Sequence, residues 1–390
     1  MEKREGLEEF SLLGGPLHRL GCRLGLVRGG TNTVALGLVL GAIPWIILLA
    51  LALVEGLGHV LFSIGAIGGH VRLLVAIPLL FMCETFIDPQ FTTFVRGIVR
   101  SQVVPATVRP ALQSEIARIT RWKDSWLPEA FFLLAAVALA LTLQAENFFD
   151  YLSGLAVGSS PRLLGETSWT RQWYWMVCIP LFRFLMLRWF WRLALWCFFL
   201  WRVSRLELRL VPTHPDRAGG LGFLEVVHSE FTPLVLAISA TQAASLAQDI
   251  ASGKLTFDAI YPGVAIVLLV DAVLFVGPLL ILFRKLWRSK VKGLNEYGAL
   301  AERYVSEFDR KWLGADPAQG EPLLGTSDIQ SLADLSNSFS IVREMRLVPA
   351  SPIMLMSLAG AALLPLLPLV LFKYPIADLL GKFLGRLSGL

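Results

Sequence analysis

The stretch from Trp173 to Arg202 decides the fold of this chain: WYWMVCIPLFRFLMLRWFWRLALWCFFLWR. It is apolar and about thirty residues long, whereas a helix needs only about 20 residues to cross the hydrocarbon core of a bilayer. Yet it carries Arg183, Arg188 and Arg192. A charged residue at the centre of a spanning helix costs on the order of 3 kcal/mol, so these arginines require acidic partners, water or anionic ligands.

The composition of the whole chain indicates the same class of protein. The 390 residues are 55% hydrophobic and 17% charged, whereas globular domains are roughly 25% charged. The apolar residues fall into separate runs of about 20 residues. We therefore predict an all-α, polytopic helical membrane protein with about seven spans. The first apolar run is of full span length and lacks a small-residue cleavage site, which predicts a permanent span rather than a signal peptide.

The spans divide the chain into three parts. They are predicted at 33–54, 72–87, 126–145, 173–202, 230–250, 262–283 and 354–372. The parts are a bundle over 1–283, a soluble helical layer over 284–351, and a last span with an amphipathic tail over 352–390. Pro365 and Pro368 interrupt the last span, which leaves open six spans plus a re-entrant hairpin.

The distribution of Lys and Arg predicts the orientation. The loops on one side collect most of them, whereas the other side holds Arg162, Arg171, Lys254 and, at its edge, Arg72. Basic loops face the cytoplasm. The amino terminus, the loop 203–228 and the layer 284–351 are therefore predicted inside, in a multi-pass protein of the cell (inner) membrane.

Two acidic residues are candidate partners for the arginines. Asp271 lies near the middle of the sixth span at a depth similar to Arg183, which predicts an intramembrane ion pair. Glu84 lies about one turn inside the cytoplasmic end of the second span, within reach of Arg188 or Arg192. Three interpretations stay open: ion pairs that lock the bundle, an anion path lined by arginines, and arginines that snorkel to the interface.

The fifth span carries a polar stripe on one helical face. Its polar members are Glu230, Thr241, Ser245 and Gln248. Such a stripe is typical of close helix packing with hydrogen bonds across the contact, and equally of a water-filled path. Together with Arg183, Arg188 and Arg192, these residues form the predicted transport path.

The most polar loop, PTHPDRAGGLGF from Pro212 to Phe223, has three interpretations. The first is an anion site, because glycines permit close backbone approach and exposed amides bind anions. The second is a structured turn. The third is a metal site, since Glu225-x-x-His228 has a helical ligand spacing. The anion-site residues are His214, Asp216, Arg217, Gly219 and Gly220, and the candidate metal ligands are His214, Asp216, Glu225, His228 and Glu230.

The predicted helices of the soluble layer 284–351 indicate that several copies of the chain assemble. A helix from 284 to 313 has an aromatic seam, and a second amphipathic helix runs from 327 to 345. The seam consists of Leu294, Tyr297, Tyr304, Phe308 and Trp312. A large apolar patch usually marks an interface, which predicts a symmetric homo-oligomer.

These patterns favour a channel or transporter for a small solute, with an anion as the leading candidate, through a path near the fourth and fifth spans. The alternatives are a membrane-embedded enzyme or metal protein acting at the loop, and a structural or signalling partner. The sequence holds no Walker loop, G-x-S-x-G or H-E-x-x-H motif, which argues against the common enzyme classes. The four cysteines show no metal spacing. No cofactor and no nucleic acid are expected, and the expected partners are the lipid bilayer, further copies of the chain and a small solute or ion.

Overall fold

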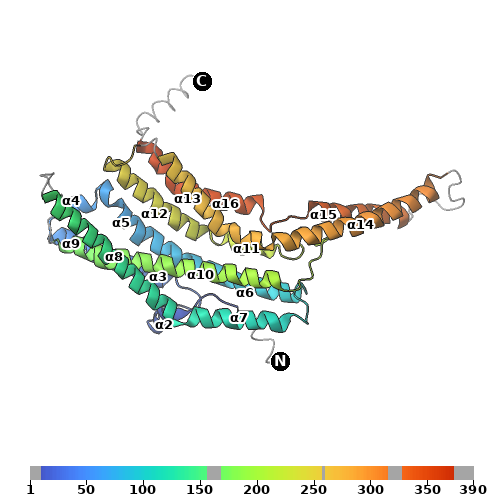
Figure 1. Cartoon of the computed structure of the whole chain (residues 1–390), viewed down its shortest axis with the longest axis horizontal. Coiled ribbons are helices and arrows are strands. Elements are labelled where there is room, and N and C mark those ends of the chain that lie inside the picture. The colour runs from blue at the N-terminus through green and yellow to red at the C-terminus, as the bar shows by residue number, and fades with distance from the viewer. Residues whose placement is uncertain (1–9, 156–167, 257–259, 315–326, 373–390) are drawn as a thin grey trace, which may run out of the picture.

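Helices make up the fold of this protein (Figure 1). The computed structural model describes residues 10–155, 168–256, 260–314 and 327–372. Within these ranges there is no strand, only an isolated bridge between Arg28 and Asn32. The prediction of an all-α fold is confirmed for this part of the chain.

The helices are α2 (Gly15–Arg23), α3 (Val34–Val54), α4 (Gly58–Leu61), α5 (Ile67–His70), α6 (Ile77–Arg100), α7 (Arg109–Asp124), α8 (Trp126–Leu155), α9 (Trp169–Trp173), α10 (Ile179–Arg205), α11 (Phe223–Ser229), α12 (Thr232–Ala251), α13 (Ile260–Phe275), α14 (Phe283–Trp312), α15 (Ser327–Glu344) and α16 (Pro352–Leu363). Shorter π and 3-10 segments are η1 (Ile64–Ala66), η2 (Val71–Ala76), η3 (Tyr174–Cys178), η5 (Gly277–Leu282) and η6 (Leu364–Phe372). Prolines open α7, α12 and α16, where the missing N–H costs no helical hydrogen bond.

Five stretches of helix are long and apolar enough to cross a membrane. They are Val34–Val54, Ile64–Arg100, Trp169–Arg205, Phe223–Ala251 and Pro352–Val370. The number rises to seven if each of two bent pairs is one span: α7 with α8, bent by 42°, and α13 with α14, bent by 44°. The second and third of these stretches are longer than the predicted spans because η2 and η3 continue into α6 and α10.

The long helices lie side by side as a bundle (Figure 1). Helix α10 packs on α8, α3 packs on α6, and α12 packs on both α6 and α16. We call the end that carries α2, α7, the loop 206–222 and the start of α14 the basic end. We call the opposite end, which carries α4, α5, α9 and the C-terminus of α12, the pocket end.

The last apolar stretch runs the length of α12 and does not turn back. Helix α16 contacts α11 at the basic end. Further along, Ser239 Oγ of α12 donates to the Ala362 carbonyl, and Leu366 and Leu369 then pack with Ala247 at the pocket end. The two prolines are accommodated in the 3-10 segment η6. Residues 364–372 therefore continue toward the pocket end, as a full span requires, and the predicted tail 376–387 lies outside the described residues.

Helices α14 and α15 pack on each other and form an arm that extends beyond the bundle (Figure 1). Tyr304 Oη donates to the Asp328 carbonyl at 3.1 Å, and Lys311 Nζ lies 2.8 Å from the Asp328 carboxylate. The seam residues of α14 are half-buried. Helix α15 therefore covers part of the seam.

Candidate functional site

Two arginines of α10, Arg188 and Arg192, are buried at the basic end of the bundle. Arg188 and Arg192 are four residues apart, so they share one face of the helix. Only 3% of Arg188 and 6% of Arg192 is exposed. Because a buried charge without a partner is strongly destabilising, the residues around them must supply the opposite charge.

Two glutamates supply that charge. Arg188 Nη1 lies 2.6 Å from Glu84 Oε1, and its Nε donates to Glu129 Oε1 at 2.9 Å. Arg192 Nη1 pairs with the same oxygen of Glu84. Glu84 comes from α6 and Glu129 from the first turn of α8, so the network joins three helices. The structure thus brings Glu84 to both Arg188 and Arg192.

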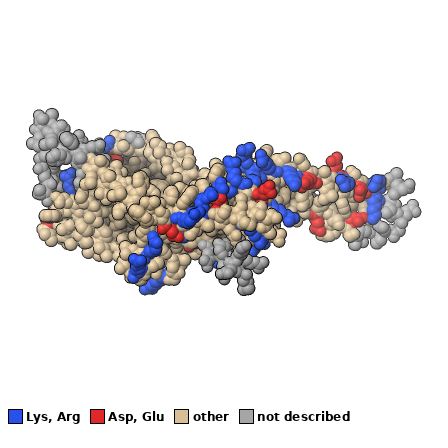
Figure 2. All heavy atoms as spheres, turned by 60° about the horizontal axis from the view of Figure 1, so that its bottom comes forward, with Lys and Arg blue, Asp and Glu red and all other residues tan. Residues whose placement is uncertain are grey.

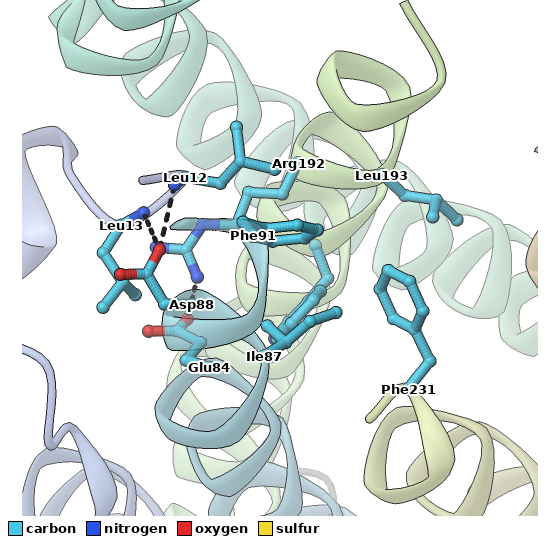
Figure 3. A pocket seen from close by; sticks show the side chains of 10 residues that line it. Leu12, Leu13, Glu84, Ile87, Asp88, Phe91, Arg192, Leu193 and Phe231 are labelled. Atoms are coloured by element: carbon cyan, nitrogen blue, oxygen red, sulfur yellow. Dashed lines mark hydrogen bonds and ion pairs between the residues drawn. The ribbon is translucent and has the colours of Figure 1, made fainter. Parts of the chain in front are cut away.

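The amino-terminal segment 10–17 seals this network (Figure 3). Asp88, one turn beyond Glu84, accepts hydrogen bonds from the backbone N–H of Leu12 at 3.0 Å and of Leu13 at 3.2 Å, and from Ser11 Oγ at 2.8 Å. Leu17 N–H donates to Glu129 at 2.9 Å. The segment is therefore held by the acids of the network itself.

Aromatic packing fixes the start of the same segment. Phe10 is fully buried and stacks on Phe199, with ring centroids 4.4 Å apart. It also packs on Phe91 and on Trp196, which is itself fully buried. Burying a phenylalanine side chain contributes about 2–3 kcal/mol. This packing adds to the hydrogen bonds that hold the segment in place.

Little open space remains around Arg192. One cavity beside it, lined by Glu84, Asp88 and Leu13, measures about 10 Å³, and a second on its other side is of similar size. Each is near the minimum for a single water molecule. Among the described residues, the two cavities that Arg192 lines are therefore too small for a solute larger than water.

The pocket end holds a much larger cavity of about 380 Å³. The short helices after α3, which the sequence leaves as a weakly apolar loop, form one side. The other side comes from α9, η3 and the last turn of α12. Among the residues described around this pocket there is a cation, Arg171, and no acidic side chain. Its volume lies in the range of small-ligand sites.

Beside this pocket lies Arg72, in η2. Its Nη1 donates to Tyr174 Oη at 2.7 Å and its Nη2 to Ser245 Oγ at 3.2 Å. Tyr174 and Gln248 line the pocket, and Ser245 is one turn from Gln248 in α12. The guanidinium group of Arg72 is thus held against the pocket by neutral partners.

Arg183, in the first turns of α10, faces the same region. Arg72 and Tyr174 are the ionisable groups close enough to affect its charge, and its Nη1 is buried with no hydrogen-bond partner. Among the described residues neither Arg72 nor Arg183 forms an ion pair. These two cations form the second arginine centre, and unlike the first it carries no compensating carboxylate.

The predicted pair between Arg183 and Asp271 is not formed. Asp271 is 6% exposed, and both of its carboxylate oxygens are buried without a hydrogen-bond partner. Its helix α13 packs on α12, α16 and η5, whereas Arg183 turns toward η2 and η3. Arg183 and Asp271 lie at similar depth in their predicted spans, but their side chains do not meet.

The polar stripe of α12 serves mainly in helix contacts. Thr241 is buried and its hydroxyl donates to the Ile238 carbonyl of its own helix. Gln248 donates to the Gly65 carbonyl at 2.5 Å, and Ser245 meets Arg72. Glu230 precedes α12 at the basic end, away from the pocket. Of the predicted path residues, Arg183, Ser245 and Gln248 gather around the pocket end, whereas Arg188 and Arg192 belong to the closed network.

The polar loop binds its own carboxylate. Asp216 accepts hydrogen bonds from the backbone N–H of Ala218 at 2.8 Å, Gly220 at 3.2 Å and Gly222 at 2.7 Å. Partial burial works to raise the pKa of Asp216, but these three bonds and the neighbouring His214 together lower that pKa below its ordinary value. An external anion would have to displace Asp216 from these donors.

Positive φ angles and a neighbouring helix shape this turn. Gly219 and Gly220 have φ of 67° and 95°, and a Cβ at Gly220 would lie 2.6 Å from Val103, so glycine is required there. Arg217 pairs with Glu344 at 3.0 Å, on the surface. In this structure the loop is therefore a structured turn that docks on the end of α15.

The candidate metal ligands do not converge. Within the described residues no group of three or more His, Cys, Asp and Glu side chains is placed to hold a metal ion. His228 is fully buried, and its two ring nitrogens meet the Phe275 carbonyl at 2.7 Å and Trp196 Nε1 at 3.2 Å. His228 is therefore a packing residue of the core.

The sequence reasoning missed three parts of these centres. Glu129 lies in the third predicted span and is not among the predicted partners, although an acid in the first turn of that span is a natural partner for a buried arginine. Arg72 is the first residue of the second predicted span and is not among the predicted path residues. The segment 10–17 belongs to the predicted cytoplasmic terminus, although Phe10, Leu12 and Leu13 form an apolar group within it.

Comparison of the chain with protein-family models, with curated proteins and with solved structures finds no match.

Proposed function

We propose that the chain is a multi-pass membrane protein with seven spans and with its basic end in the cytoplasm. The five apolar helices and two bent pairs support the spans. The basic side chains support the orientation, because those at the basic end are exposed where the chain leaves the bundle, as in Arg100, Arg205 and Arg284. The amino terminus and the arm would then be cytoplasmic, in the cell (inner) membrane.

Its function, in this proposal, is to bind a small anion and conduct it across the membrane. The observation that carries the proposal is the second arginine centre. Arg72 is bonded to Tyr174, which lines a cavity of about 380 Å³, Arg183 lies close to both, and neither arginine has a carboxylate partner among the described residues. A cation in a low-dielectric site is stable only with a counter-charge. A bound anion would supply that charge at Arg72 and Arg183.

The closed network at the basic end would act as the inner gate. An anion leaving the arginine centre toward the cytoplasm would meet Arg188 and Arg192, which are neutralised by Glu84 and Glu129 and covered by the segment 10–17. Opening would require that this segment leave Asp88. The closed arrangement described above would then be the resting state.

Anion flux into liposomes tests the proposal. Purified protein is reconstituted, and chloride and nitrate uptake are measured for the wild type and for Arg72→Gln and Arg183→Gln. The matched control is Arg303→Gln, which removes an exposed arginine from the arm. We expect both pocket-end variants to lower flux at least tenfold and the control to leave it unchanged. Equal flux in all four proteins, or none in the wild type, would contradict an anion pathway.

A second candidate function is assembly through the arm. Leu300 and Val305 of α14 are 47% and 41% exposed, outside the contact with α15, and exposed apolar residues on one helix favour an interface between copies. Leu300→Glu with Val305→Glu should lower the oligomeric mass measured by light scattering. A wild-type protein that is monomeric at all concentrations would contradict a homo-oligomer.

A further inference from the structure

The first turns of α14 combine exposed aromatic and basic side chains directly after an apolar helix. The sequence from Phe283 to Leu294 reads FRKLWRSKVKGL. The stretch made of η5 and α14 bends away from α13 by 44° at Val276. The basic residues begin eight residues beyond this bend, at Arg284.

One stripe along these turns is apolar and open. Phe283, Trp287 and Val291 are spaced by four residues, so they follow one another along one face. Their exposed fractions are 38%, 50% and 39%, and the rings of Phe283 and Trp287 stack with centroids 6.2 Å apart. In the described structure no other element covers this stripe.

A parallel stripe is basic and open. Arg284, Arg288 and Lys292 have the same four-residue spacing, lie one position further along the helix, and are all exposed. Arg284 and Arg288 have no charged partner among the described residues, and Lys292 Nζ lies 3.7 Å from exposed Glu296. At one turn of helix per 3.6 residues, the two stripes lie side by side.

The remaining two basic residues of the stretch point inward. Lys285 Nζ donates to the Leu206 carbonyl at 2.9 Å, and Lys290 Nζ donates to the Met345 carbonyl at 2.8 Å. They fix this helix against the loop before α11 and against the end of α15. The stretch is therefore held firmly by two of its cations, which orients the other three outward.

We propose that this face of α14, residues 283–292, lies in the headgroup region of the bilayer and binds anionic phospholipid. Exposed aromatic side chains beside basic ones at the end of a span are suited to that region, where rings meet the acyl boundary and cations meet phosphate. Several Lys or Arg residues directly cytoplasmic of a span attract anionic lipids. The inference rests on the proposed membrane insertion and orientation.

The distribution of charge favours lipid over an acidic protein. Figure 2 shows Lys and Arg gathered in a band between the largely uncharged body and the arm, whereas both signs are mixed along the arm. A band of one sign at the edge of an apolar body follows the plane of a membrane surface. An acidic protein would use the cations but would leave Phe283 and Trp287 in contact with water.

Native mass spectrometry of the full-length protein tests the assignment. The protein in neutral detergent is titrated with phosphatidylglycerol and, separately, with phosphatidylcholine. The test variant is Arg284→Gln/Arg288→Gln/Lys292→Gln. The matched control, Arg303→Gln/Arg310→Gln/Arg343→Gln, removes the same charge from exposed positions of the arm. A further variant, Arg284→Lys/Arg288→Lys, keeps the charge.

We expect the wild type, the arm control and the charge-keeping variant to retain phosphatidylglycerol in preference to phosphatidylcholine. We expect the test variant to bind it on the order of tenfold or more weakly, since each surface cation adds appreciably to the attraction. Equal retention by the test variant and the arm control, or no preference between the two lipids in the wild type, would overturn the proposal.

Three further readouts separate the remaining explanations. Release of the bound lipid by millimolar inorganic phosphate would overturn lipid binding, because it would show a free-phosphate site. If the test variant fails to fold, tryptophan fluorescence provides the test instead. Brominated phosphatidylglycerol should quench the fluorescence of the wild type more than that of Trp287→Phe. Equal quenching in the two proteins would overturn the proposal. Alkaline carbonate extraction separates the two claims: a protein that stays in the membrane but shows no lipid preference contradicts this inference alone.

Discussion

The two arginine centres solve the same physical problem in opposite ways. At the basic end, Arg188 and Arg192 share Glu84, Arg188 also meets Glu129, and the segment 10–17 closes over them. At the pocket end, Arg72 has only neutral partners and Arg183 Nη1 has none, next to an open cavity. The first centre is complete in charge within the chain, although Arg192 Nη2 and Glu84 Oε2 are buried without a hydrogen-bond partner. The second has no carboxylate partner among the described residues, and on this difference we base the proposal that it binds an anion.

The largest expected effect comes from breaking the complete centre. Glu84→Gln removes the charge shared by Arg188 and Arg192, so it should lower the free energy of unfolding by about 3 kcal/mol, because it leaves buried cations without compensation. Arg72→Gln, the control at the pocket end, removes only two hydrogen bonds to neutral groups and should cost about 1 kcal/mol. Unfolding by sodium dodecyl sulfate in mixed micelles measures both. Losses of equal size would contradict the distinction between the centres.

The next effect concerns the seal over the complete centre. Asp88→Ala removes the acceptor of two backbone N–H groups and of Ser11 Oγ. Losing these charge-assisted bonds should ease local opening by about 2 kcal/mol. Hydrogen exchange of the Leu12 and Leu13 amides should then be about 30-fold faster.

A milder change at the same place provides the control for the seal. Thr92→Val removes the single bond from Thr92 Oγ1 to the Phe10 carbonyl, and it should speed exchange about fivefold, as the loss of about 1 kcal/mol implies. Unchanged exchange in Asp88→Ala would show that the aromatic packing of Phe10 alone holds the segment.

A carboxylate satisfied by backbone donors gives a third comparison. Asp216→Asn should destabilise the protein at neutral pH by about 1 kcal/mol, since three N–H groups lose their charged acceptor. The folded pKa of Asp216 is lowered, so its contribution is present above the pKa of the unfolded chain and is lost as the pH falls through the folded pKa. The thermal midpoints of wild type and variant should differ at pH 7, and the difference should shrink as the pH falls below about 4. A difference that does not shrink on acidification would contradict this origin.

The smallest effect is expected at the unpaired acid. Asp271→Asn should change the free energy of unfolding by less than about 0.5 kcal/mol, because Asp271 has no partner to strand. An ion pair with Arg183, as depth in the sequence suggests, would instead make the loss about 3 kcal/mol. The same denaturation in mixed micelles measures this change in the free energy of unfolding. A loss of about 3 kcal/mol would show that Asp271 and Arg183 are paired.

The helical class and the positions of the apolar helices were predictable from the sequence. Runs of about 20 apolar residues can satisfy their backbone in hydrocarbon only as helix, so length and composition suffice. Similar depth also predicted that Glu84 lies within reach of Arg188 or Arg192, and the structure brings Glu84 to both. Helix α15 begins at Ser327, where Ser and Gln three residues apart predict a cap.

The side-to-side arrangement of the helices was not predictable from one sequence. Depth places a residue along the bundle axis but says nothing about which helix faces it, which is why Asp271 was assigned to Arg183. The pocket depends on short helices between 58 and 70 whose glycine-rich sequence has no clear period. Residues 10–14 have no regular secondary structure and 15–17 begin α2, and the hydrogen bonds of this segment go to Asp88 and Glu129, far away in the sequence.

The reversal potential of the purified protein in a planar bilayer tests the account most directly. With a tenfold gradient of potassium chloride and no other permeant ion, an anion pathway past Arg72 and Arg183 predicts a reversal potential close to the chloride equilibrium potential. It also predicts a shift toward zero in Arg183→Gln. A reversal potential near that of potassium, or one that Arg183→Gln leaves unchanged, would contradict the assignment of the unpaired arginines to an anion.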